Sequence, residues 1–185
     1  MPDRPIFTDV LQVAVVVQNL DKAMKNYWEL YGIGPWIVYD FNPSTVSNMI
    51  IHDQRADYAM RLALCDVGKV QWELIEPLDD KSIYADFLKK HGEGLHHVAL
   101  GVENYDQAMA YFRDKGIGVV QGGTWHDFTY TYLDTQDTFS TIAEIYNPPP
   151  DFVWPPADAT YPPKEADLHP AVAEGELELA VGMPM

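Results

Sequence analysis

The pattern of apolar and polar positions occurs twice along the chain. Residues 13–24 read VAVVVQNLDKAM and residues 98–109 read VALGVENYDQAM, with seven identical positions at an offset of 85. Each copy opens with a Val-rich run that predicts a buried strand and continues into an amphipathic helix. We expect Asp21 and Asp106 to cap the N-termini of these two helices. The repeat therefore predicts two copies of one structural module.

Sequence rich in β-forming residues follows each predicted helix. The candidate strands are 35–41, 58–65 and 69–76 in the first copy, and 118–121, 128–134 and 140–146 in the second. The predicted fold class is α+β, with two βαβββ modules at 8–78 and 95–147 joined by a helix at 81–91. Residues 148–185 hold nine of the 14 prolines. We expect them to form an extended tail over the surface or across a partner subunit, and we assign the tail no chemistry.

Four polar residues fall at equivalent places on the predicted strands. Gln12 lies opposite His97 just before the first match, and Glu73 lies opposite Glu144 when WELIEP is aligned with AEIYNP. Carboxylates on apolar strands are costly to bury unless they are paired or bind a cation. An amide oxygen, an imidazole nitrogen and two carboxylates suit a divalent metal such as Zn, Ni, Co, Mn or Fe(II). We therefore expect one metal site per chain.

The register of the strands decides which side chains share this site. A shift of one residue turns every side chain to the other face of the sheet, so His96 is an alternative to His97 as the ligand. A single Gln or Glu on a half-exposed strand more often faces solvent. The prediction of a metal site therefore depends on the equivalence of the two pairs rather than on any one residue.

The charge balance narrows the classes of partner. Twelve Lys and Arg stand against 28 Asp and Glu, which gives a net charge of -16. This charge would repel a nucleic-acid backbone and disfavours a polyphosphate cofactor. No apolar run approaches the ~18 residues of a membrane span, and MPDRPIFTDV lacks the pattern of a secretion signal. Cys65 is the only cysteine, so no internal disulfide is possible and a cytoplasmic location is expected.

These features resemble the vicinal oxygen chelate superfamily, above all glyoxalase I and methylmalonyl-CoA epimerase. The strings LHHVALGVENYDQAMAYFRDKGI and WELIEPLDD carry the resemblance, which covers about residues 8–147. The resemblance implies a homodimer in which a curved eight-stranded sheet surrounds the metal, with Gln12, Glu73, His97 and Glu144 as ligands. It also implies that Glu144 is both a ligand and the main base, while Glu73 delivers the proton on the opposite face.

Departures from the glyoxalase pattern narrow the expected substrate. Members that use glutathione typically carry an Arg and an Asn where this chain has Val16 and Pro77, so the glutathione carboxylate would lack its clamp. We expect a metal-dependent isomerase or lyase that moves a proton next to a metal-bound carbonyl of a neutral, partly apolar ketone. The reaction would be an enolisation, an epimerisation or an enone double-bond shift. The aromatic residues expected to line the pocket are Trp36, Tyr39, Trp125, Tyr130 and Tyr132.

Several other functions stay open at this point. Lactoylglutathione lyase and methylmalonyl-CoA epimerase belong to the same superfamily, although the acidic chain disfavours a polyanionic CoA ester. An extradiol-type dioxygenase needs Fe(II) held by two His and one carboxylate, whereas this chain offers Gln12 at the first position. A metal-free protein that binds cationic drugs would suit the charge but would not need four aligned ligands. Metal analysis separates that binding protein from the enzymes, and oxygen consumption separates the dioxygenase from the isomerase.

Overall fold

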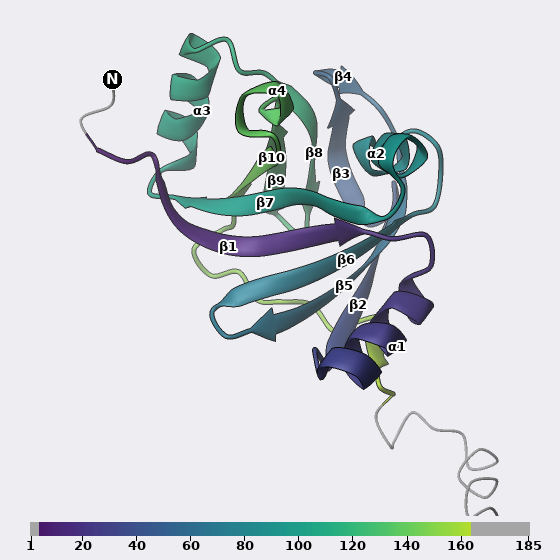
Figure 1. The fold of residues 1–185 in the computed structure, drawn as a ribbon. Helices are drawn as coiled ribbons and strands as arrows, with labels where there is room; N and C mark the ends of the chain where they lie inside the picture. The colour runs from purple at the N-terminus through teal and green to yellow at the C-terminus, as the bar shows by residue number, and fades with distance from the viewer. Residues whose placement is uncertain (1–3, 164–185) are drawn as a thin grey trace, which may run out of the picture.

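The computed structural model describes residues 4–163, and its main feature is one strongly curved β-sheet (Figure 1). The strands are β1 (Phe7–Val16), β2 (Trp36–Phe41), β3 (Val46–Ile51), β4 (Gln54–Arg55), β5 (Met60–Val67), β6 (Val70–Pro77), β7 (Gly94–Val102), β8 (Val119–Trp125), β9 (Phe128–Leu133), β10 (Ile142–Asn147) and β11 (Ala159–Tyr161). The helices are α1 (Leu20–Tyr31), α2 (Ile83–His91), α3 (Tyr105–Asp114) and α4 (Gln136–Phe139). The strand order is β11-β2-β5-β6-β1-β7-β10-β9-β8-β3-β4, so the expected α+β class is confirmed.

The centre of the sheet is built from the two Val-rich strands of the repeat. β1 and β7 pair antiparallel, β1 pairs parallel with β6, and β7 pairs parallel with β10. Figure 1 shows β1 and β7 side by side, with α1 and α3 at opposite ends of this pair. α1 packs on β5 and β6, and α3 packs on β10. The apolar residues of the two helices therefore pack against one face of the sheet, around Leu74 of β6 and Ile145 of β10.

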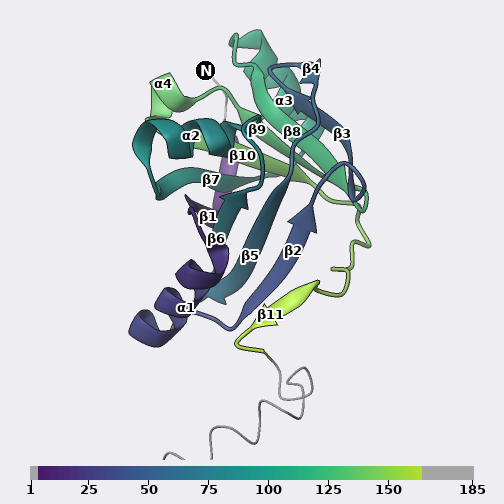
Figure 2. The ribbon, with the colours of Figure 1, turned by 90° about the vertical axis from the view of Figure 1, so that its right-hand side faces the viewer.

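The expected number of eight strands is too low, because β3, β4 and β11 extend the sheet at its two edges. β3 follows β2 in the chain but pairs antiparallel with β8 on the opposite side of the concave face (Figure 2). Its pairing register shifts between Ser47 and Ile50, and Asn48 has a positive φ of 52°. Such an irregularity breaks the period-two alternation by which a strand is found in a sequence.

The helices of the repeat begin at asparagines, so the prediction of Asp21 and Asp106 as N-caps is wrong. Asn19 precedes α1 and Asn104 precedes α3, and both have extended backbone angles. Each side-chain oxygen accepts a hydrogen bond from the amide of the third helical residue, at 2.8 and 2.9 Å. The two aspartates lie in the first turn of each helix. Their negative charge interacts favourably with the helix dipole there, but they do not cap the helix.

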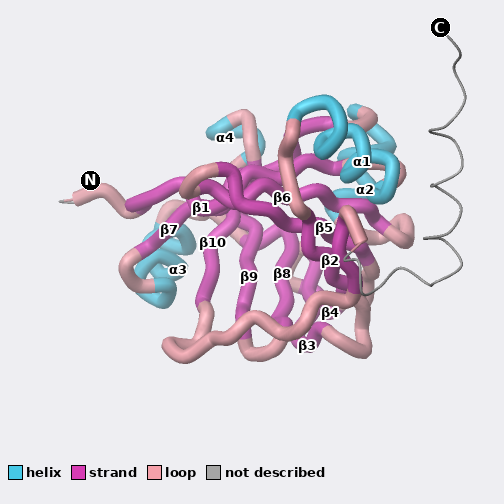
Figure 3. The backbone as a smooth tube through the Cα atoms, turned by 90° about the horizontal axis from the view of Figure 1, so that it is seen from below, coloured by secondary structure: helices cyan, strands magenta, loops and turns pink. Residues whose placement is uncertain are grey.

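Part of the expected tail closes the open side of the curved sheet. Residues 148–158 cross from the end of β10 to β2 (Figure 3). β11 then pairs antiparallel with β2 (Figure 2). The rest of the expected tail, 164–185, lies outside the described residues. None of the helices within residues 4–163 has the length and apolarity that a membrane crossing requires.

Candidate metal centre

Four adjacent strands each contribute one of the polar residues singled out by the repeat. In sheet order these residues are Glu73 on β6, Gln12 on β1, His97 on β7 and Glu144 on β10. Ala14 is in register with both Glu73 and His97. Ala99 is in register with both Gln12 and Glu144. Since residues in register share a face of the sheet, all four side chains project together, above two alanines that leave space.

The imidazole of His97 lies between the two carboxylates. Its Nε2 is 3.1 Å from Glu144 Oε2 and 3.3 Å from Glu73 Oε2. All four polar residues are buried, with at most 5% of any of them exposed. Neither His97 Nε2 nor Glu73 Oε2 makes a hydrogen bond of acceptable geometry. Buried polar atoms without a partner are costly, so this arrangement calls for a positive charge among the three groups.

The proton on His97 supplies this charge when no metal is bound. Burial lowers the pKa of His97, but the carboxylates of Glu144 and Glu73 more than reverse that effect and raise it to about 9. Burial also raises the pKa of Glu73, against the opposing effect of His97, and the charge of Glu144 raises it further. A divalent cation would displace the proton, since a ligating imidazole must be neutral at the nitrogen that binds.

The donor atoms fit a divalent metal. Two donors bound at right angles to one ion, with bonds of ~2.1 Å, lie ~3.0 Å apart, close to the two separations around His97 Nε2. An imidazole with carboxylates suits Zn, Mn, Co, Ni or Fe(II). Within residues 4–163, no group of three or more His, Cys, Asp or Glu side chains is already arranged to hold an ion. A bound ion would therefore require small shifts of these side chains.

Tyr146 and Gln71 orient the predicted ligands and were not found from the sequence. The Tyr146 hydroxyl donates to Gln12 Oε1 at 2.7 Å or to Glu144 Oε2 at 3.0 Å. The Gln12 amide nitrogen donates to Gln71 Oε1 at 2.7 Å. Strand periodicity could have found both residues, because Tyr146 lies two positions after Glu144 and Gln71 two positions before Glu73, on the same face.

His96 contacts the side of His97 that faces away from the carboxylates. The two Nδ1 atoms are 2.9 Å apart, and His96 sits where the pairing of β1 with β7 shifts register. Burial lowers the pKa of His96 to about 2, so this imidazole is neutral. A neutral His96 accepts a hydrogen bond from His97 Nδ1–H and thereby orients the other nitrogen toward the carboxylates. The structure thus places His97, and not His96, against Glu73 and Glu144.

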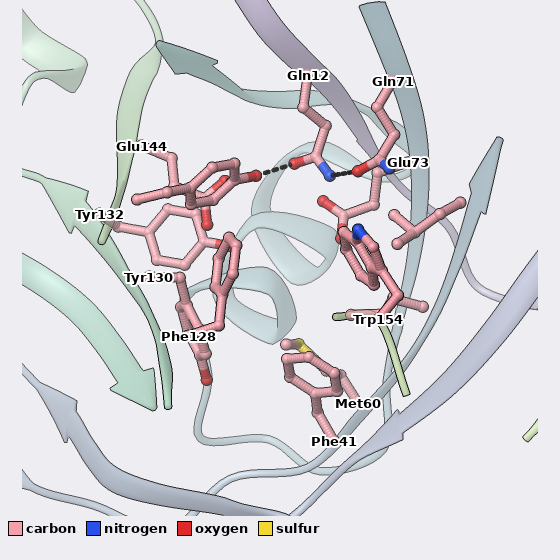
Figure 4. Close-up of a pocket in the computed structure, with 13 residues that line it drawn as sticks. Gln12, Phe41, Met60, Gln71, Glu73, Phe128, Tyr130, Tyr132, Glu144 and Trp154 are labelled. Carbon is pink, nitrogen blue, oxygen red and sulfur yellow. Dashed lines mark hydrogen bonds between the residues drawn. The ribbon is translucent and has the colours of Figure 1, made fainter. Parts of the chain in front are cut away.

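A largely apolar pocket opens beside these residues and contains about 490 Å³ of space, part of it open to solvent. Its lining residues, drawn in Figure 4, are Gln12, Phe41, Met60, Leu62, Leu64, Gln71, Glu73, Phe128, Tyr130, Tyr132, Glu144, Tyr146 and Trp154. Two of the five expected aromatic residues, Tyr130 and Tyr132, are among them.

Three of the expected aromatic residues do not line this pocket. Trp36 is buried in a cluster on the other face of the sheet with Leu20 and Met24 of α1. Tyr39 and Trp125 pack on each other at 4.9 Å within the core. Aromatic residues favour strands in general, so their identity alone does not say which face they occupy.

The chain belongs to the Glyoxalase/Bleomycin resistance protein/Dioxygenase superfamily, whose family model matches residues 11–131. This confirms the family resemblance. The matched segment contains Gln12, Glu73 and His97, and it ends before Glu144.

Several relatives are methylmalonyl-CoA epimerases. The mitochondrial enzyme of Bos taurus is 28% identical over 109 residues, which are 58% of this chain and 54% of that protein. The chain spans about half the length of the first curated relatives it matches. The structure of methylmalonyl-CoA epimerase from Mycobacterium tuberculosis has a TM-score of 0.60 and 25% identity, and the match covers 81% of this chain and 94% of that one. Hypothetical protein BH1468 from Bacillus halodurans C-125 shares the fold, with a TM-score of 0.61, 18% identity, and coverage of 79% of this chain and 98% of that one.

Proposed function

We propose that the protein is a metal-dependent isomerase or lyase that moves a proton next to the carbonyl group of a neutral, partly apolar ketone. The observation that carries this proposal is the convergence of Glu73, His97 and Glu144 at an apolar pocket. With Gln12 these residues would hold one divalent ion, which when bound would polarise the substrate carbonyl and make the neighbouring C–H bond more acidic. The likeness to epimerases, which are isomerases, supports the same class of reaction.

The two carboxylates are placed to take the proton and to return it. Both line the pocket, and they flank His97 from two sides. Glu73 Oε2 has no hydrogen-bond partner, so this carboxylate is less restrained than Glu144 and can turn toward a substrate in the pocket to accept its proton. Glu144 is held in place by the hydroxyl of Tyr146. The contacts therefore favour Glu73 as the base that takes the proton, whereas Glu144 keeps a fixed position. This assignment reverses the roles implied by the family resemblance.

The lining of the pocket favours a substrate without negative charge. Of the lining residues that the structure describes, none is a Lys or Arg, whereas two are glutamates. A buried phosphate or carboxylate would find no cation there to compensate for its loss of hydration. The space beside the glutamates is bounded mainly by aromatic rings, Met and Leu, which suit the apolar part of a ketone.

The first test combines metal analysis with isotope exchange. The untagged protein is dialysed, its metal is measured by plasma mass spectrometry, and Mn, Co, Ni or Zn is then supplied. We expect close to one ion per chain and, in heavy water, loss of the α-proton signal of suitable neutral ketones by NMR. A metal content near zero that no added metal restores would contradict the proposal. Sedimentation of the same sample tests the expected homodimer.

Methylmalonyl-CoA epimerase is the second candidate function, because relatives of that name match the chain. It is tested in the same experiment by following the α-proton of methylmalonyl-CoA. Exchange of that proton without exchange of any ketone would favour the epimerase. Assays with methylglyoxal and glutathione should give no thioester, since Val16 and Pro77 provide no clamp for the glutathione carboxylate.

A further inference from the structure

We propose that residues 148–158, which we call the strap, form the outer wall of the pocket and select substrates that carry an aromatic ring beside the reacting carbonyl. This inference rests on the proposed function, because it names the substrate class of the same site. The strap follows β10 and lies beyond residues 11–131, the segment matched by the family model. Of the strap residues, Trp154 is the one that lines the pocket.

The strap is tied to β2 at several points, so the position of Trp154 is fixed by the fold. The Tyr39 hydroxyl donates to the carbonyl oxygen of Pro155 at 2.9 Å. The backbone amide of Asp40 donates to Asp158 Oδ2 at 2.8 Å, and the Asp158 amide donates to the carbonyl oxygen of Val38 at 2.9 Å. Five prolines within the strap further restrict its backbone.

Trp154 is packed on one side and open on another. Its ring centroid lies 5.9 Å from that of Tyr39 in a stacked arrangement, and 5.9 Å from that of Trp125. The residue is nevertheless 46% exposed although it lines the pocket. Figure 4 shows Trp154 on the side of Glu73 and Phe128 on the side of Glu144. The ring centroids of Phe152 and Phe128 lie 5.6 and 6.3 Å from that of Trp154, so part of this indole stays exposed next to the polar centre although four rings pack around it.

The other residues that line the pocket also favour a ligand with an aromatic ring. Phe41, Phe128 and Tyr130 add aromatic surface. The polar side chains of the lining are the three predicted ligands Gln12, Glu73 and Glu144, together with Gln71 and the tyrosines. A ligand with a flat ring at one end and a carbonyl at the other matches this division. An aromatic ring packs with rings such as these at centroid distances of ~4.5–7 Å, and each pair adds roughly 2- to 10-fold in affinity beyond the buried area.

The test compares two chelators that are uncharged in neutral solution, share one metal-binding head and each release one proton when they bind a metal. Benzohydroxamic acid carries a phenyl ring where acetohydroxamic acid carries a methyl group. Their affinities for the metal-loaded full chain are measured by titration calorimetry and corrected for their affinities for the free metal. We expect the phenyl compound to bind at least ~10-fold more tightly to the unaltered protein.

The substitution Trp154→Ala should reduce this preference about tenfold, mainly through weaker binding of benzohydroxamic acid. Trp154→Phe should restore most of the preference. Val153→Ala is the matched control, because Val153 is the neighbouring strap residue and is 81% exposed. Metal content and thermal unfolding are measured for each variant. An unchanged preference in Trp154→Ala, or an equal loss of both compounds, would overturn the role of the strap. If the unaltered protein takes up no metal or binds neither compound, the proposed function fails, and the inference fails with it.

Discussion

The two halves of the site start from equivalent places in the repeat but have different surroundings. In the second half, Glu144 receives a hydrogen bond from Tyr146. In the first half, Glu73 Oε2 has no partner, and burial raises the pKa of this carboxyl group. The polar residues of the central strands differ as well, since the Gln12 amide nitrogen donates to Gln71 while His97 Nε2 makes no hydrogen bond. An internal repeat can therefore determine the positions of equivalent side chains, while later divergence of the two copies gives these side chains different contacts and roles.

The largest effect is expected where the two halves meet. His97→Ala removes the nitrogen that contacts both glutamates and leaves two buried carboxylates without a positively charged neighbour. We expect the metal affinity to fall by more than the ~10- to 100-fold that loss of a residue supporting a ligand typically costs. The fall in metal affinity is measured as the metal content after dialysis. The control is His91→Ala, because His91 belongs to α2 and lies outside the site. Full metal content in His97→Ala would remove His97 from the centre.

The comparison of the two glutamates is tested directly by Glu73→Gln and Glu144→Gln. Each change keeps the size of the side chain and an oxygen ligand but removes the base. We expect Glu73→Gln to slow α-proton exchange by ~10²–10⁴-fold, the usual cost of losing a general base. Glu144→Gln should slow the exchange less, because Tyr146 already holds this carboxylate in place.

The readout is deuterium incorporation by NMR at matched metal content. A larger loss in Glu144→Gln would restore the assignment implied by the family resemblance. A full rate in either variant at full metal content would remove that residue from the mechanism.

Acid should weaken metal binding, because the proton on His97 competes with the metal. The pKa of His97 is raised to about 9, so the group is protonated at neutral pH when no metal is bound. Metal affinity should therefore rise with pH, by up to ~10-fold per unit, and level off above about 9. Calorimetry in buffers of different ionisation enthalpy counts the released protons. Binding that is independent of pH between 6 and 8, with no proton release, would contradict the arrangement.

Tyr146→Phe removes a hydrogen bond from Gln12 and Glu144 but none from Glu73. We expect a ~10- to 100-fold loss of metal affinity, as for other residues that orient metal ligands. Tyr58→Phe is the matched control, since its buried hydroxyl bonds to Tyr130 and to the carbonyl of Gly122 instead. Equal effects of the two substitutions would indicate general destabilisation.

The sequence predicted the elements of the repeat and the connecting helix at 81–91, and it missed β3, β4, α4 and β11. Gln12, Glu73, His97 and Glu144 come together because two similar segments build adjacent strands, and their likeness reveals the register. The predicted strand at 118–121 stopped before Gly122 and Gly123, yet β8 continues through both. A Cβ atom at Gly123 would lie 2.5 Å from the hydroxyl of Tyr130, so this glycine allows a close approach that only the folded chain reveals.

Trp154 illustrates the limit of pattern reasoning about the site. It stands in a proline-rich segment without periodicity, and the tail was expected to have no chemistry. Its place in the pocket depends on contacts with Tyr39 and Trp125, which are more than 25 residues away in sequence. Such contacts leave no local signal, in contrast to the period-two spacing that joins Tyr146 to Glu144.

The smallest expected effect concerns the helix caps, where the two halves should behave alike. Asn19 and Asn104 have nearly the same backbone angles and accept hydrogen bonds of 2.8 and 2.9 Å. Asn19→Ala and Asn104→Ala should each lower the free energy of unfolding by ~1 kcal/mol, the typical cost of losing such a cap, as measured by urea denaturation. Asp106→Asn is the control, because it removes only a first-turn charge and should cost less, ~0.3–1 kcal/mol. A greater loss of unfolding free energy in Asp106→Asn than in Asn104→Ala would return the capping role to the aspartate. Clearly unequal losses in Asn19→Ala and Asn104→Ala would show that the two halves differ beyond the site.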